Sequence, residues 1–253
     1  MIPPGSSLEY GTKLVRPDMG FWGFVLYPDA AEGGGSFRSA AGPSHTGRTE
    51  LPLDSRDDAT RRARGKVRRY CAANRLNRLG TLTYRGDGCH DPAGLREDLG
   101  GFFRRLRASV GERFPYLWVP EWHKSGHGLH AHFAVGRYVR HGALEAAWAR
   151  GFVHITLLGD LPTGSGALGE ARLASRYLSK YVGKDLGEGK AAGLHRYEVA
   201  QGFQPKSIEL DGATVEAVVG WAESLMDRPA GHVWRSRDDE AWNGPPAVWA
   251  SWD

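Results

Sequence analysis

The chain is poor in cysteine and lacks a long apolar run, and each shortage excludes a class of protein. Its only cysteines, Cys71 and Cys89, cannot build a disulfide framework and do not have C-x-x-C spacing. An uninterrupted run of about 18 apolar residues, which a membrane-spanning helix needs, is absent. The first twenty residues lack the apolar stretch of a signal peptide. We therefore expect a cytoplasmic protein with reduced thiols and no membrane partner.

Acidic residues are missing from one segment, although the net charge of the whole chain is only +4. Residues 61–78 hold eight basic side chains and no carboxylate. Such a segment favours a polyanion, because lysine and arginine neutralise phosphates and release their counterions. A solvated helix face would have the same composition, so charge alone does not identify the partner. The candidate DNA-binding residues are Arg61, Arg62, Arg64, Lys66, Arg68, Arg69, Arg75 and Arg78.

Composition divides the chain into three parts. Residues 1–60 form an extension rich in glycine and proline, and we expect it to order poorly apart from an apolar strand at 21–27. Residues 61–190 show regular patterns and form the main domain. Residues 191–253 are expected to pack on that domain, with an amphipathic helix near 213–226 and a tryptophan-rich end.

Hydrophobic periodicity gives the order of elements in the main domain. A basic helix opens it, and the order that follows is β-α-β-β-α-β-α. This order predicts an α+β fold, a ferredoxin-like sandwich with a central, mainly antiparallel sheet and flanking helices. The expected strands are 79–84, 116–123, 129–137 and 152–158, and the expected helices are 93–110, 141–150 and 168–186.

Two histidines alternate on one of these strands. In the run 129–135, Leu-His-Ala-His-Phe-Ala-Val, His130 and His132 project to the same face, while the residues between them face the core. Two imidazoles on one sheet face can ligate one divalent ion. An isolated H-x-H pattern is a weak signal, so a third ligand is needed to support a metal site on the exposed face of the sheet.

Glu121 is the best third ligand. It lies on the preceding strand, and the short glycine-containing connection 124–128 folds the two strands into a hairpin that brings Glu121 near the histidines. Two histidines and one carboxylate suit Mn²⁺ or Mg²⁺ with positions left for phosphate oxygens. His123 is a reserve ligand, and His127 in the connection is a weaker competitor.

A tyrosine pair is the second candidate feature. Tyr177 and Tyr181 are four residues apart, so on a helix they share one face, with Lys180 and Lys184 on an adjacent one. A tyrosine needs activation before it can attack phosphorus, because its ordinary pKa is near 10. A neighbouring lysine and a metal-polarised phosphate would provide that activation. Tyrosines with this spacing are also common as packing residues.

Taken in chain order, these segments resemble the motifs of the HUH endonucleases, in particular the rolling-circle replication initiators of plasmids and phages. Residues 81–84 look like the first motif of the family, a strand of unclear catalytic role. Residues 129–133 look like its His-hydrophobic-His metal motif. Residues 177–180 and 181–184 both look like its Tyr-x-x-Lys motif, as in two-tyrosine initiators. The resemblance covers about residues 66–190.

The resemblance implies a metal-dependent endonuclease that nicks single-stranded DNA and also rejoins it. A tyrosine would form a 5′-phosphotyrosine link and leave a 3′-hydroxyl for a polymerase. Tyr181 is slightly favoured, because Tyr181-Val-Gly-Lys184-Asp185 looks like the form seen in single-tyrosine relatives. The implied partners are single-stranded or hairpin DNA at a replication origin and a host helicase and polymerase. The chain lacks a G-x-x-x-x-G-K-[ST] motif for a fused helicase.

Three other functions remain open at this point. An HUH transposase or relaxase would use the same residues on a different DNA. A non-catalytic module could bind single strands on a ferredoxin-like sheet, although it would be expected to show aromatic stacking residues on its central strands. A structural metal protein is a weaker alternative, because structural zinc favours four ligands rich in cysteine.

Overall fold

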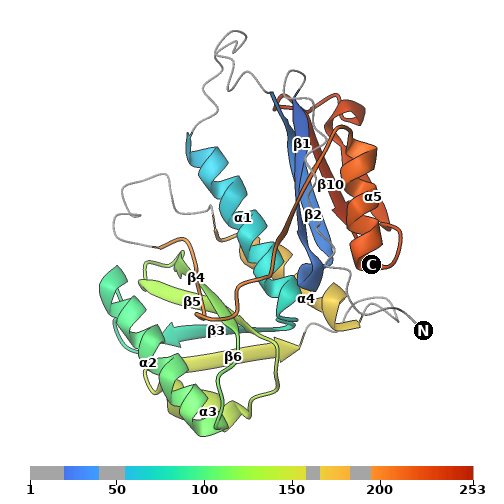
Figure 1. Ribbon diagram of the computed structural model, residues 1–253. Coiled ribbons are helices and arrows are strands. Elements are labelled where there is room, and N and C mark those ends of the chain that lie inside the picture. The colour runs from blue at the N-terminus through green and yellow to red at the C-terminus, as the bar shows by residue number, and fades with distance from the viewer. Residues whose placement is uncertain (1–19, 40–54, 158–165, 183–194, 253) are drawn as a thin grey trace, which may run out of the picture. The chain divides into compact units, whose positions relative to one another are not determined.

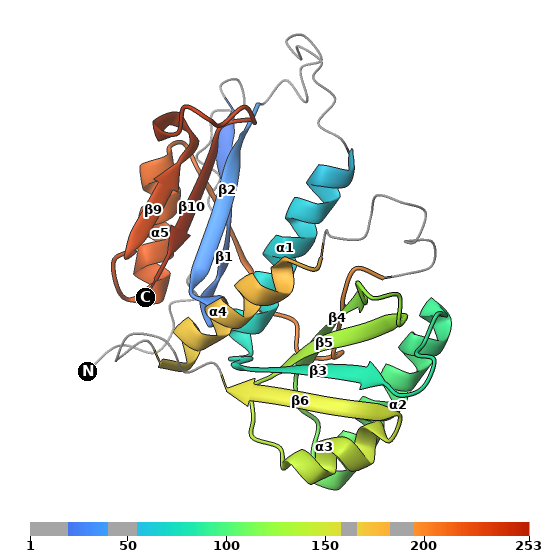
Figure 2. The same ribbon diagram turned by 180° about the vertical axis from the view of Figure 1, so that it is seen from behind.

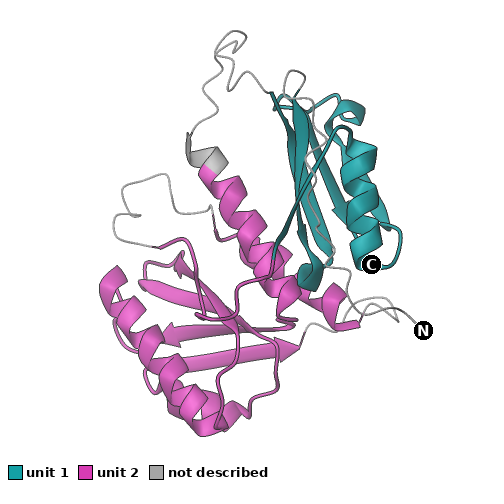
Figure 3. Cartoon of the chain, in the orientation of Figure 1, with its two compact units in different colours: residues 1–51, 207–253 teal, residues 52–206 magenta. Residues whose placement is uncertain are grey.

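The computed structural model describes residues 20–39, 55–157, 166–182 and 195–252. The chain divides into two compact units, one made of residues 1–51 and 207–253 and the other of residues 52–206 (Figure 3). The first unit thus combines the two ends of the sequence, while the second contains every motif singled out above. The boundaries expected near residues 60 and 190, and the packing of the C-terminal segment on the main domain, remain predictions.

The second unit is built on a five-stranded sheet with the order β6-β3-β5-β4-β7. Its first four strands and two intervening helices follow the chain as β-α-β-β-α-β, and all their pairings are antiparallel. This is the ferredoxin-like α+β sandwich that the sequence predicted. The elements are β3 (Arg78–Tyr84), α2 (Pro92–Val110), β4 (Tyr116–Trp122), β5 (Leu129–Val135), α3 (His141–Trp148), β6 (Gly151–Leu157) and β7 (Glu198–Val199).

The two faces of this sheet carry different cores. The α2 and α3 face buries a large aromatic and aliphatic cluster that includes Phe102, Phe103, Phe133 and Trp148. The other face is covered by two helices that lie side by side, α1 (Ser55–Ala73) and α4 (Gly166–Ser179) (Figures 1 and 2). A second cluster lies there, of Val67, Tyr70, Leu76, Leu79, Leu117, Val119, Ala134 and Leu178.

The helix that carries the tyrosines ends earlier than expected. The prediction extended it to residue 186, but α4 ends at Ser179. The Lys180 amide donates to the Tyr177 carbonyl and the Tyr181 amide to the Leu178 carbonyl, each three residues back, so the chain tightens into a turn. Tyr177 is therefore helical and Tyr181 is not. Lys184 lies outside the described residues.

The first unit is a second five-stranded sheet with the order β8-β1-β2-β10-β9. Its helix α5 (Val215–Met226) packs on β1 and β8. The strands are β1 (Phe21–Tyr27), β2 (Glu32–Arg38), β8 (Ile208–Gly212), β9 (His232–Arg235) and β10 (Ala247–Ser251). The strand at 21–27 and the helix near 213–226 are confirmed, but the pairing of the two ends of the chain into one sheet was not foreseen.

The prediction that the glycine-rich part of the N-terminal extension orders poorly is wrong for β2. This strand pairs with both β1 and β10 and lies at the centre of its sheet. Its glycines are needed for close approach: a Cβ at Gly35 would lie 2.0 Å from the Gly23 carbonyl oxygen, and one at Gly33 would meet the Phe24 ring at 2.4 Å. Glycine here makes room for neighbouring strands rather than for disorder.

Helices α1, α2 and α5 begin and end near their predicted positions, and none of the helices in the described ranges is both long and apolar enough to cross a membrane. Both cysteines are free, with Cys71 buried in the core under α1 and Cys89 half-buried.

Candidate metal centre

Strand alternation sets the two histidines on the face covered by α1 and α4. Ala131 and Phe133 belong to the core under α2 and α3, whereas Ala134 belongs to the opposite core, so His130 and His132 point toward α1 and α4. Glu121 is paired with His130 in the β4–β5 register. All three side chains are buried, which corrects the expectation of a site on an exposed face. The covering helices account for the burial.

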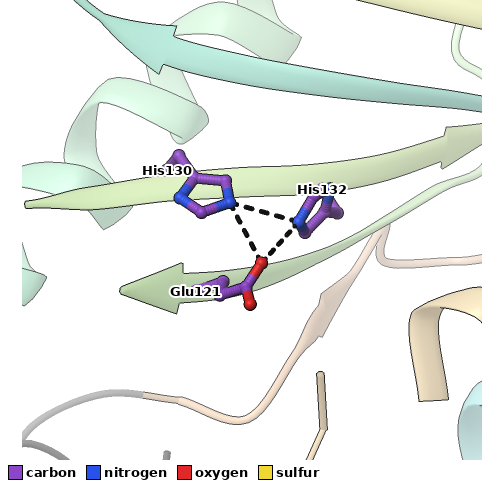
Figure 4. A group of neighbouring side chains, drawn as sticks. All are labelled: Glu121, His130 and His132. Carbon is purple, nitrogen blue, oxygen red and sulfur yellow. Dashed lines mark hydrogen bonds and ion pairs between the residues drawn. The ribbon is translucent and has the colours of Figure 1, made fainter. Parts of the chain in front are cut away.

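The three side chains converge on one point (Figure 4). Nε2 of His130 lies 3.1 Å from Oε2 of Glu121, and Nε2 of His132 lies 2.9 Å from the same oxygen. The two Nε2 atoms are 3.2 Å apart. Ligand atoms that share one ion at about 2.1 Å and near right angles lie roughly 3 Å from one another, so these separations fit a divalent ion.

The chemistry of the three groups also fits a cation. Two neutral imidazoles and a carboxylate place three lone-pair atoms within contact distance, and a shared positive charge relieves their repulsion. Burial lowers the pKa of His130, and the charge of His132 lowers it further, while Glu121 acts in the opposite direction. The neutral form, which is the form that binds metals, is therefore favoured at neutral pH. The cluster can hold a metal ion, and Mn²⁺ or Mg²⁺ remains the prediction for its identity.

Thr81 on β3 supports only one of the two histidines. Thr81 and His132 are cross-strand partners, and the Thr81 hydroxyl lies 3.1 Å from Nδ1 of His132. When Nε2 of His132 serves as a ligand, its Nδ1–H donates to this hydroxyl and sets the orientation of the ring. Nδ1 of His130 is buried and makes no hydrogen bond to any described residue. The first motif of the resemblance thus has a visible contact with the metal centre.

The tyrosine pair lies directly beside this centre. The Tyr181 ring stacks on His132, with centroids 4.2 Å apart and planes 23° apart. The Tyr177 ring meets His132 edge-on at 5.8 Å and Tyr181 at 5.3 Å. The structure therefore brings both predicted nucleophiles to the predicted metal ligands, and of the two Tyr181 is closer to His132. Lys180 lies with Nζ 5.6 Å from the centre of the Tyr177 ring.

The Tyr181 hydroxyl is held in its neutral form in the absence of a cation. Burial raises its pKa most, followed by the hydrogen bond and charge of Tyr177 and the negative charge of Glu121. The contribution of Glu121 shows that the tyrosine senses the charge of the metal ligands. A cation bound to Glu121 would offset that contribution and favour the phenolate.

The reserve ligands lie outside the triad. Nδ1 of His123 contacts the Ser125 hydroxyl at 2.6 Å, and its ring lies 5.5 Å from that of His130. His127 contacts the Tyr84 carbonyl through Nε2 at 3.1 Å. Neither joins the group of converging ligand atoms found among the described residues.

The basic segment divides between three kinds of structure. Arg61, Arg62, Arg64 and Lys66 are exposed on α1, while Arg68 and Arg69 are half-buried on it. Arg64 donates to the Ser179 carbonyl at the end of α4, 3.2 Å away. The helix thus lies on the same side of the sheet as the triad, as expected.

Two members of the segment are placed differently. Arg75 lies in the turn after α1 at φ 52°, and its guanidinium donates to the Ala72 carbonyl. Arg78 begins β3, where strand alternation directs it to the face away from the triad, and it donates to Asn77. The segment is therefore not one continuous surface, because the helix stops at Ala73.

Comparison with known proteins agrees with this geometry. Residues 77–186 match the model of a family described as replication-associated protein ORF2. Searches of curated proteins and of solved structures each found no match. The matched segment contains β3, the triad of Glu121, His130 and His132, and both tyrosines. Residues 77–186 therefore belong to this family of replication-associated proteins, and the resemblance to rolling-circle replication initiators is confirmed for this part of the chain.

Proposed function

We propose that the protein is a metal-dependent endonuclease and strand transferase that initiates rolling-circle replication on single-stranded or hairpin DNA through a 5′-phosphotyrosine intermediate. The observation that carries the proposal is the stacking of Tyr181 on His132 beside the Glu121–His130–His132 triad. A nucleophile and a potential Lewis-acid site lie on one side of one sheet. The family match supports a role in replication.

The chemistry follows from these groups. An ion held by the triad would polarise an oxygen of the scissile phosphate. The tyrosine hydroxyl oxygen forms a bond to phosphorus and gives up its proton, while the bond from phosphorus to the 3′ oxygen breaks and that oxygen takes up a proton. The products are a tyrosyl phosphodiester and a free 3′-hydroxyl. Because a phosphodiester replaces a phosphodiester, the reverse reaction rejoins the strand.

The neighbouring side chains would assist in defined ways. Tyr177 shares a hydrogen bond with Tyr181 and touches the same histidine, so it can accept the proton or act as a second nucleophile. Lys180 would stabilise charge on the phosphate, and Lys184 is proposed for the same role on sequence grounds. The exposed basic residues of α1 would hold the strand backbone.

The test is covalent capture. The protein is incubated with Mn²⁺ and a pool of single-stranded hairpin DNA with randomised loops, and adducts are resolved on a denaturing gel. Tyr181→Phe removes one hydroxyl and keeps the ring that stacks on His132, so we expect it to lower adduct formation more than Tyr177→Phe. The double variant should form none. Tyr138→Phe, at a tyrosine 71% exposed and away from the triad, is the matched control.

A double variant that still becomes linked to DNA would contradict the tyrosine mechanism. A wild-type protein that binds the DNA but forms no adduct with Mn²⁺ or Mg²⁺ would instead favour a non-catalytic binding module.

A further inference from the structure

An aromatic ring stands exposed on the edge strand of the catalytic sheet. Phe152 on β6 is 74% exposed, which is unusual for a phenylalanine within a strand. Its neighbours Val153 and Ile155 face the core under α2 and α3, so strand alternation directs Phe152 to the opposite face. No packing role explains a ring that is exposed to this degree.

The register of the sheet aligns Phe152 with the metal centre. Phe152 is the cross-strand partner of Thr83, and His154 is the partner of Thr81, which in turn pairs with His132. Continuing the β3–β5 register by one residue sets Thr83 beside His130, which pairs with Glu121. Phe152 therefore ends a row that runs across the sheet through the triad. Two strand spacings, roughly 10 Å, separate β6 from β5.

The surface around Phe152 is polar rather than apolar. The side chains that share its face on the two outer strands are Thr81, Thr83, His154 and Thr156, and His154 hydrogen-bonds Thr156 at 3.0 Å. Helices α1 and α4 pack over β3, β4 and β5 on this face, while Phe152, His154 and Thr156 on β6 stay exposed. We call this group of Phe152, His154, Thr156 and Thr83 the β6 strip.

We propose that the β6 strip binds a base of the single-stranded DNA next to the cleaved phosphate, with Phe152 as the stacking platform. The inference rests on the proposed function and adds a specificity-determining site to it. An aromatic ring stacks on any base, and hydroxyl and imidazole groups beside it can bond to base edges. A distance of roughly 10 Å corresponds to about one or two nucleotides of an extended strand leaving the triad.

The surroundings favour a nucleic-acid base over a protein partner. A stable protein interface needs about 800 Å² on each side, with an apolar centre. The β6 strip offers one aromatic ring among hydroxyls and an imidazole. The exposed arginines and lysine of α1 lie on the same side of the sheet, so the backbone of the same strand would meet positive charge.

The experiment separates stacking from general hydrophobic contact. Single-stranded oligothymidylate with one central 2-aminopurine is titrated with the Tyr177→Phe/Tyr181→Phe protein without metal, so no reaction occurs. Stacking on an aromatic ring quenches 2-aminopurine fluorescence. We expect Phe152→Leu to remove the quenching and to weaken binding by about tenfold, since base stacking commonly contributes this much or more. Phe152→Trp should retain both signals.

The matched control is Tyr138→Leu, which removes the other highly exposed aromatic side chain of this unit away from the triad. It should leave quenching and affinity unchanged. Unchanged quenching and affinity in Phe152→Leu would overturn the inference, as would a Phe152-dependent change in oligomeric state without an effect on DNA. If Phe152→Leu loses quenching but wild-type protein never forms an adduct, the stacking site stands and the proposed reaction fails. If adducts form and Phe152→Leu binds normally, only the stacking site fails.

Discussion

The two faces of the β6-β3-β5-β4-β7 sheet are made by the same strands but serve opposite purposes. Toward α2 and α3, β5 contributes Ala131 and Phe133 to a close-packed core in which Phe133 meets the rings of Phe102 and Phe103 at 5.7 and 6.2 Å. Toward α1 and α4, the alternate residues of the same strand are His130 and His132. One face gains stability from burial, and the other buries polar groups that gain a full set of partners only with a cation. A rigid strand thus positions the ligands.

The largest expected difference between the faces comes from removing one residue from each. His130→Ala should abolish DNA cleavage and the rise in melting temperature that Mn²⁺ causes in the wild type, because a ligand present at 100 times its Kd stabilises the folded state by about 2.7 kcal/mol. Phe133→Leu should keep the Mn²⁺ response and lower the free energy of unfolding by about 1 to 2 kcal/mol. Calorimetry with and without Mn²⁺ measures both. A full Mn²⁺ response in His130→Ala would show that the triad is not the metal site.

A smaller effect is expected when only the support of a ligand is removed. Thr81→Val keeps the shape of the side chain but removes the hydroxyl that contacts Nδ1 of His132. We expect Mn²⁺ affinity to fall by about 10- to 100-fold, as for other residues that orient metal-bound histidines. Thr83→Val, on the same strand and face, should leave it unchanged. Equal affinities for both variants by isothermal titration would contradict a supporting role for Thr81.

Acid should separate the faces without any mutation. The pKa of His130 is lowered by burial and by His132, so its neutral, ligand form persists below the ordinary histidine pKa of about 6.5. We expect Mn²⁺ affinity to stay level from about pH 7.5 to 6.5 and to decline in more acidic buffer as protons compete for the imidazoles. The near-ultraviolet signal of the aromatic core should not change over this range. A decline that begins well above pH 6.5 would contradict a lowered pKa.

The smallest effect is expected from charges on the surface. The double change Arg62→Glu and Lys66→Glu alters exposed residues of α1 and should weaken single-stranded DNA binding for all sequences alike. The slope of log affinity against log salt should fall by roughly 0.7 for each phosphate that the variant no longer neutralises. Arg104→Glu, exposed on α2 across the sheet, is the control. If the control weakens binding as much as the double change, the effect is one of net charge and not of the α1 surface.

Much of this could be predicted because it depends on local periodicity. The alternation of the run 129–135 placed both histidines on one face, and the glycine-containing connection 124–128 indicated the hairpin that pairs Glu121 with His130. The ferredoxin-like order followed from the succession of strands and helices. Local patterns were misleading for β2, where three successive glycines indicated disorder, because the reason for those glycines lies on the neighbouring strands.

The amino-acid sequence by itself therefore determined the strands, the helices and the side of the sheet to which each ligand points, because the strand period of two and the helix period of 3.6 are properties of the backbone. Only the tertiary structure decided that the triad is buried, that Tyr181 leaves the helix and stacks on His132, and that Thr81 supports that histidine. The tertiary structure also joined residues 21–38 to residues 208–251 in a second sheet. Contacts between residues far apart in the chain depend on packing energies summed over the whole unit, and no local pattern contains them.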